Sequence, residues 1–125
     1  MPSYPGPNQA PLLHENQWYY LLQNETVVDG TASRAVQLRR LKGTTYFVGV
    51  SLEITFSGDP GTFAIDIQTA DNDLASKYVT IDQAVGALNA DFVTRIELPS
   101  FWAKFLRVNV VTLTNPVNVT VLVTR

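Results

Sequence analysis

The most regular alternation of apolar and polar side chains runs through residues 46–56 and again through residues 63–70. A period of two is typical of β-strands with one buried face. The segment 57–61 between the two arms contains Ser, Gly, Asp and Pro, which favour a reversal of the chain. We therefore expect an antiparallel hairpin with one apolar face, which a second sheet must cover.

A second pair of alternating segments closes the chain. Residues 106–110 and 117–123 each place an apolar side chain at every second position, and Pro116 lies at the turn between them. Weaker patterns predict strands within 17–22, 24–29, 34–41, 78–82 and 92–98. Residues 83–91 are rich in Ala and Gly, so we expect a long loop there, with room for one helical turn capped by Asp82.

Together these segments predict an all-β fold. About eight short strands, separated by turn residues at fairly regular spacing, indicate an antiparallel two-sheet β-sandwich that is jelly-roll-like. The sandwich should span residues 17–125. Its expected inward side chains are Val48, Val50, Leu52, Ile54, Phe56, Ile65, Ile67, Val108, Val110, Val119 and Val121.

Residues 1–16 differ in composition from the rest of the chain. They contain Pro2, Pro5, Pro7 and Pro11, and proline lacks the backbone donor that regular structure uses. We expect an extended, proline-rich N-terminal arm. It could be a loose end, or a clasp that orders only against a neighbouring molecule.

Several residues are candidates for contacts with a partner or a second copy. The strand at 18–22 is apolar on both faces, which is typical of a strand covered on both sides or facing another subunit. The arm contributes apolar side chains, and Arg39 and Arg40 belong to a basic cluster that could meet an acidic partner or simply be solvated. The predicted contact residues are Tyr4, Leu12, Leu13, Trp18, Tyr20, Leu22, Arg39 and Arg40.

Composition narrows the chemistry. The chain has 125 residues, no cysteine, one histidine and a net charge of -2, so it fits one domain and offers no basic surface for nucleic acid or an anionic membrane. No signal peptide or membrane-spanning run is evident. His14 lies in the arm, where catalytic geometry is hard to hold. We expect no catalytic, cofactor-binding or metal-binding residues, and therefore no enzyme.

Two groups of residues nevertheless suggest a possible binding site, one for calcium and one for a sugar. Asp66, Asp71 and Asp73 could gather with Asp59 or Asp82 as calcium ligands, although turn formation and solvation are the favoured roles because the later elements of an EF-hand loop are missing. Four aromatic residues could form a platform for a sugar ring, or else plug the core or contact a subunit. These are Trp18, Tyr20, Phe101 and Trp102.

The closing unit, residues 101–125, resembles the terminal hairpin of small virion proteins of tailed bacteriophages, including capsid decoration or cement proteins. The likeness lies in an aromatic-Leu-Arg-Val strand, a Thr-Asn-Pro turn and a Val-Thr strand; residues 63–73 resemble them also. The resemblance implies a jelly-roll-like, non-enzymatic structural protein. Its expected place is the virion, assembled in the host cytoplasm.

Two functions follow as hypotheses. The first is a capsid decoration protein that forms a homo-oligomer, a dimer or trimer, and stabilises the phage head by binding the major capsid protein or another virion protein. The alternative is a carbohydrate-binding β-sandwich module, associated with a phage fibre or a glycoside hydrolase. Neither needs a cofactor, nucleic acid or a membrane.

Overall fold

A computed structural model describes residues 10–13, 16–38, 49–86, 92–98 and 104–125. Within these ranges the chain forms nine strands and one short 3₁₀ helix. They are β1 (Trp18–Thr26), β2 (Thr31–Ala32), β3 (Val36–Gln37), β4 (Val50–Phe56), β5 (Phe63–Ala70), η1 (Ala75–Lys77), β6 (Val79–Gly86), β7 (Val93–Leu98), β8 (Phe105–Leu113) and β9 (Asn118–Thr124). The described residues contain no helix long and apolar enough to cross a membrane.

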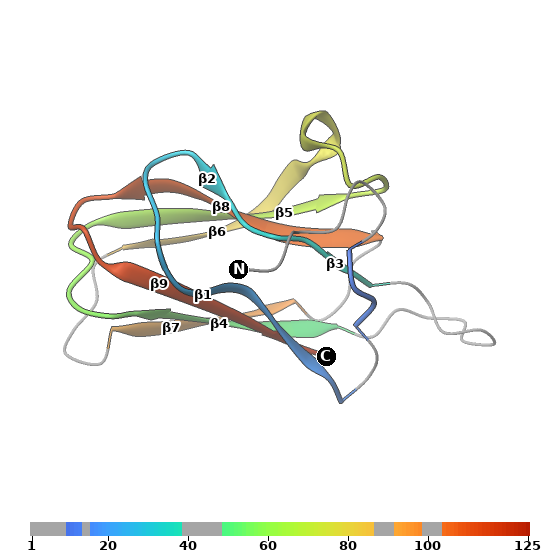
Figure 1. Ribbon diagram of the computed structural model, residues 1–125, viewed down its shortest axis with the longest axis horizontal. Helices are drawn as coiled ribbons and strands as arrows, with labels where there is room; N and C mark the ends of the chain where they lie inside the picture. The colour runs from blue at the N-terminus through green and yellow to red at the C-terminus, as the bar shows by residue number, and fades with distance from the viewer. Residues whose placement is uncertain (1–9, 14–15, 39–48, 87–91, 99–103) are drawn as a thin grey trace.

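The strands form two stacked antiparallel sheets (Figure 1). One sheet has the order β1-β9-β4-β7, and the other has the order β2-β8-β5-β6 with β3 also paired to β8. β2 and β3 therefore act as one interrupted strand. The pairs are nested, since β1 pairs with β9, β2 and β3 with β8, β4 with β7, and β5 with β6. Nested pairs of this kind, folded over into two sheets, are the arrangement of a jelly roll, so the expected all-β sandwich is confirmed.

The predicted central hairpin is wrong in its pairing. β4 pairs with β7 and β9, whereas β5 pairs with β6 and β8, so the two arms lie in different sheets. The connection at 57–62 is therefore an arch from one sheet to the other. It lies beside the corresponding β8–β9 connection, where Asn115 N donates to Pro60 O at 3.0 Å. The two apolar faces therefore cover each other, and the rings of Phe56 and Phe63 meet with centroids 4.9 Å apart.

The core confirms the expected inward set. Its described members are all buried, and the central ones are fully so: Ile54, Ile65, Val108, Val110, Val119 and Val121 have no exposed area. Val48 lies outside the described residues. Alternation therefore identified the buried face of each central strand correctly, although not the neighbour of each strand.

β1 is apolar on both faces for a local reason. Its register with β9 shifts between Tyr20 and Leu22 and again between Leu22 and Glu25, which places bulges in the strand. A bulge inserts an extra residue and disrupts the strict alternation. Leu21 and Leu22 are consequently both buried in this chain's own core.

The arm and the sandwich are joined at residues 10–13. Gln37 N donates to Pro11 O at 2.8 Å and Leu13 N donates to Gln37 O at 2.9 Å, so this segment runs beside β3. The Arg125 Nη1 atom donates to Leu13 O at 2.6 Å. Because Leu13 belongs to the main core, residues 10–13 belong to the sandwich, and the expected boundary at residue 17 is too late.

The loop expected at residues 83–86 is also wrong. These residues complete β6 instead of starting a loop, and Asp82 does not cap a helix there. Its carboxylate accepts a hydrogen bond from the backbone N–H of Gln83 at 2.8 Å. The remainder of the expected loop, 87–91, lies outside the described residues.

Candidate functional site

The outer face of the β5–β6–β8 sheet carries a chain of hydrogen-bonded polar side chains, called here the polar ladder: Asp66, Gln68, Thr80, Gln83 and Arg107. Asp66 accepts from Gln83 Nε2 at 2.5 Å and from Thr80 Oγ1 at 3.2 Å. Gln68 Nε2 donates to Thr80 Oγ1 at 3.4 Å, and Arg107 Nε donates to Gln68 Oε1 at 2.9 Å. The alternation of the strands explains this face, because the neighbouring Ile65 and Ile67 point into the core.

The ladder ends at an aromatic residue. The Arg107 guanidinium carbon lies 3.9 Å from the ring centroid of Tyr78, a cation–π arrangement. The Tyr78 hydroxyl donates to Asp73 Oδ1 at 2.6 Å. Burial raises the pKa of Tyr78 well above its usual range, and Asp73 raises it further. Burial also lowers the pKa of Arg107.

This arrangement presents donors and acceptors side by side on the outer face of the sheet. The carboxylate, amide, hydroxyl and guanidinium groups hold one another through the contacts above, so their orientation is set before any ligand arrives. Preorganised polar groups of this kind can bind a ligand rich in hydroxyl groups.

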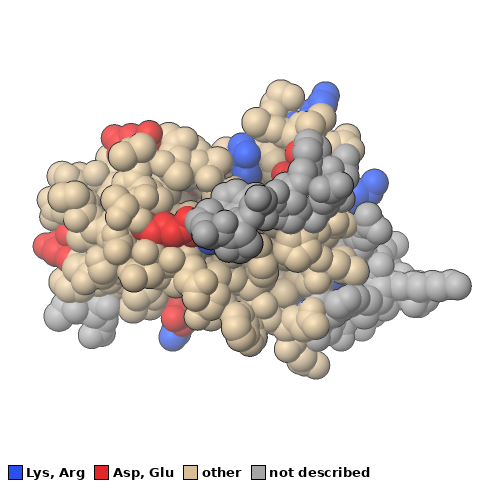
Figure 2. All heavy atoms as spheres, in the orientation of Figure 1, with Lys and Arg blue, Asp and Glu red and all other residues tan. Residues whose placement is uncertain are grey.

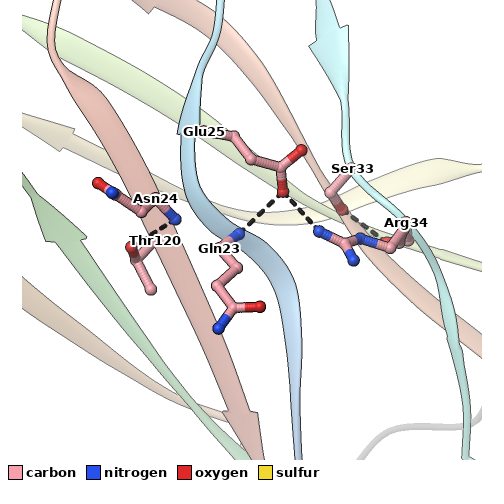
Figure 3. Close-up of polar contacts among 6 residues, drawn as sticks. All are labelled: Gln23, Asn24, Glu25, Ser33, Arg34 and Thr120. Atoms are coloured by element: carbon pink, nitrogen blue, oxygen red, sulfur yellow. Dashed lines mark hydrogen bonds and ion pairs between the residues drawn. The ribbon is translucent and has the colours of Figure 1, made fainter. Parts of the chain in front are cut away.

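A second polar cluster lies between the two sheets at one side of the sandwich (Figure 3). Glu25 of β1 pairs with Arg34, which lies between β2 and β3, at 2.6 Å, and the Glu25 carboxylate also accepts from the N–H of Gln23 at 2.8 Å. Nearby, Thr120 Oγ1 accepts from the N–H of Asn24, which has a φ of 48°. These contacts satisfy the backbone at the second bulge of β1, so the cluster has a structural role.

The exposed aromatic of β1 lies beside a hollow. Trp18 is 62% exposed, and it helps to line a hollow of about 390 Å³ together with Leu12, Gln17, Tyr19 and Val36. Trp18 and Tyr20 meet edge to face, with centroids 5.4 Å apart and ring planes at 72°. The two rings are therefore not one flat platform, and Phe101 and Trp102 lie outside the described residues.

The predicted contact residues divide into three groups. Leu12 and Trp18 are exposed at the hollow, and Tyr20 is half-buried. The prediction is wrong for Leu13 and Leu22, because both side chains are buried in this chain's own core and cannot reach a partner. Tyr4, Arg39 and Arg40 lie outside the described residues.

The acidic residues do not gather into a shared site. Asp59 Oδ1 accepts from the N–H of Gly61 within the β4–β5 connection, whereas Asp66 and Asp73 bind Gln83 and Tyr78 elsewhere. Among the described residues, no three His, Asp or Glu side chains are close enough to hold a metal ion. The view in Figure 2 shows acidic and basic side chains in small separate groups on the described part of that face.

Besides the polar ladder, the sequence did not predict the exposed apolar edge of β6. The described residues include eight large apolar side chains that are exposed, and Val79, Ile81 and Val85 of β6 are three of them. The available signal was the apolar content of residues 78–85, but that pattern alone does not separate an edge strand from a central one.

Comparisons with known proteins add little to this description. No protein-family model matches the chain, and no curated protein matches it. A solved structure described as "Crystal structure of PirA" aligns with a TM-score of 0.48 and 15% identity, over 85% of this chain and 89% of that chain. The fold assignment therefore stands on the two sheets of this chain themselves.

Proposed function

We propose that the chain is a non-enzymatic virion structural protein of the capsid decoration type, which binds the outside of an assembled phage head as a homo-oligomer. The observation that supports the proposal is the exposed apolar surface at Trp18 and Leu12, beside the hollow of about 390 Å³. Exposed apolar patches with polar surroundings are typical of protein–protein contacts, and tryptophan is enriched among the residues that dominate such contacts.

The sequence resemblance supports this proposal, and the fold is compatible with it. Jelly rolls occur in viral capsid proteins and also in lectins, so the fold alone favours neither candidate function. The resemblance of residues 101–125 to phage virion proteins favours the first. It rests on the sequence alone, because β8 and β9 lie in different sheets and do not form the expected terminal hairpin. Many weak contacts on a repeating shell would give strong overall binding even where each contact is modest.

The experiment is co-sedimentation of the protein with empty shells of the phage that encodes it, and with its free capsid subunits. We expect recovery with shells and little with free subunits. Trp18→Ala should reduce recovery several-fold. Val28→Ala is the matched control, because Val28 is 71% exposed and lies outside the hollow.

The arm is tested by a truncation that respects the fold. Removal of residues 1–13 would delete Leu13 from the core, so the deletion stops at residue 9. Weaker shell binding by this truncated, folded protein would support a role for the arm. Undiminished binding by both the truncation and Trp18→Ala would contradict the proposed contact surface, and absence of shell binding would contradict the proposed function.

The polar ladder favours a second candidate function, carbohydrate binding. Its groups match the hydroxyl groups of a sugar, and they are already oriented by contacts with one another. A glycan array tests this candidate directly. Selective glycan binding that is lost in Arg107→Ala, together with no binding to shells, would replace the first proposal with the second.

A further inference from the structure

The outer edge of β6 combines an open strand edge with apolar side chains. Among the described residues β6 is the last strand of its sheet, and Val79 and Val85 are 61% and 60% exposed, with Ile81 also exposed. An edge strand presents unpaired backbone groups, and natural proteins usually protect such an edge with charges, prolines or bulges. β6 has one charge, Asp82, and one bulge, at Ile81, and residues 83–86 contain neither. This edge is therefore suited to pairing with another strand.

The hydrogen bonds of β8 show in which direction the backbone N–H and C=O groups of β6 point. Val108 uses both its N–H and its C=O with Ser33, on the side of β8 that faces away from β5. Ile67, opposite Val108, must therefore direct its groups toward β6, where it faces Asp82. Because successive residues alternate, the N–H and C=O of Gln83 point to the open edge. The bond from Gln83 N to the Asp82 carboxylate agrees with this direction.

Charge and register then select one arrangement for two copies. When a two-fold axis pairs β6 of one copy with β6 of the other, one residue faces the same residue of the second copy. The two strands overlap most when that residue is Asp82 or Gln83. The first register would bring two Asp82 carboxylates directly opposite each other, which is destabilising. The second makes Gln83 face Gln83 through two backbone hydrogen bonds and places Asp82 opposite Ala84.

We propose that two copies of this chain associate through antiparallel pairing of β6, centred on Gln83, to form one sheet continuous across the dimer. In this register Val85 of each copy lies beside the bulge at Ile81 of the other, so exposed aliphatic side chains of the two copies meet at both ends of the pairing. The Gln83 N–H exchanges the Asp82 carboxylate for the Gln83 carbonyl of the second copy, so it keeps a partner. This inference rests on the proposed function at one point: it gives the surface through which the proposed homo-oligomer forms.

The first test measures mass in solution by light scattering, over micromolar to millimolar concentrations. We expect the 13.8 kDa chain to double in mass as concentration rises. Val85→Lys should remain monomeric, because two lysines would be brought into the paired strands. Val28→Lys, at an exposed valine outside β6, should dimerise as the unmodified chain does. Circular dichroism checks that each variant is folded.

The second test uses the absence of cysteine from the chain. Gln83→Cys should form a disulfide-linked dimer under mild oxidation, because hydrogen-bonded antiparallel partners have Cα atoms about 5.5 Å apart, within disulfide range. Thr80→Cys is the register control. In the proposed pairing Thr80 faces Gly86, so the two Thr80 positions lie roughly 20 Å apart and should not link.

The outcomes separate the inference from the proposed function. A monomer at every concentration, dimerisation of Val85→Lys, or equal linkage of Gln83→Cys and Thr80→Cys would each overturn the β6 pairing. A dimer that shows the expected linkage but fails to bind shells would leave the pairing intact and contradict only the capsid role. Shell binding by a monomer would overturn the β6 pairing and the proposed homo-oligomer, and would leave only the capsid role intact.

Discussion

Two segments with nearly the same sequence differ in burial in this molecule. Val119-Thr120-Val121 lies in β9, where both valines are fully buried. Val79-Thr80-Ile81 lies in β6, where all three side chains are exposed. β9 is hydrogen-bonded to β1 on one side and β4 on the other, whereas β5 is the one strand beside β6 in the described part of the chain.

The difference teaches that alternation identifies a strand but not its place in the sheet. A central strand has neighbours on both sides and a second sheet over its apolar face, so its alternate side chains are necessarily covered. At β6 the register shifts beside Gln68 of β5 and leaves Ile81 out of the pairing. A bulge of this kind at an edge strand lets apolar side chains reach the surface.

The largest expected effect compares one isoleucine from each environment. Ile54 of β4 is fully buried, whereas Ile81 of β6 is 42% exposed. Ile54→Ala should lower the free energy of unfolding by about 2–5 kcal/mol, because it leaves a cavity in the core. Ile81→Ala should change it by no more than about 0.5 kcal/mol in the monomer. Urea unfolding at low protein concentration measures both, and equal losses would contradict the distinction.

A second pair of variants applies the same comparison to the arm. Leu13→Ala should destabilise by about 2–3 kcal/mol, at the lower end of the range for buried leucines because it lies near the end of the sandwich. Leu12→Ala, one residue earlier and exposed, should have little effect. If Leu13→Ala also leaves the unfolding midpoint unchanged, residues 10–13 are not part of the folded domain.

The inward faces of β4, β5, β8 and β9 could be predicted because their side chains strictly alternate. Their pairing could not, since contacts such as Ile54 with Val121 join residues far apart in the sequence. The connection at 57–62 has turn residues that suit a hairpin and an arch equally well. The strand pairing decides for the arch, because β4 and β5 lie in different sheets.

The candidate site was less predictable. The sequence predicts Trp18 as a contact residue because its strand is apolar on both faces, and Leu12 because it is an apolar residue of the proline-rich arm; both side chains are exposed. The polar ladder was not, because it needs the cross-strand neighbours of Asp66, Gln68 and Arg107. Leu22 was misassigned because a bulge changes which face a side chain occupies, and the sequence of β1 carries no clear signal of it.

A smaller effect is expected at the ion pairs, which again differ in burial. The side chains of Glu25 and Arg34 are 26% and 16% exposed, whereas those of Glu53 and Arg95 are 39% and 70% exposed. Glu25→Gln should destabilise by about 1–3 kcal/mol because charged hydrogen bonds are lost from a partly buried site. Glu53→Gln should cost about 0–1 kcal/mol. High salt should weaken the second contact more than the first, and the reverse order would contradict the assignment of Glu25 to the structural cluster.

The smallest expected effect concerns Tyr78, where the polar ladder meets the partly buried end of the sheet. Its pKa is raised above the ordinary value of 10.0, first by burial and then by Asp73, so the folded chain keeps the hydroxyl protonated when the unfolded chain has released its proton. The unfolded state then binds fewer protons than the folded state, and stability falls as pH rises. The contribution is therefore fully present below about pH 10 and is lost progressively above it.

Tyr78→Phe isolates this contribution, because it keeps the ring under Arg107 and removes only the hydroxyl that donates to Asp73. Urea unfolding from about pH 8 to pH 11 should show the unmodified chain losing stability more steeply than Tyr78→Phe above about pH 10, so that the difference between the two shrinks. Absorbance of ionised tyrosine, recorded over the same range, should lose amplitude in the variant only at the high-pH end. If the variant instead loses amplitude near pH 10, Tyr78 ionises in contact with water, and the ladder does not extend into the partly buried end of the sheet.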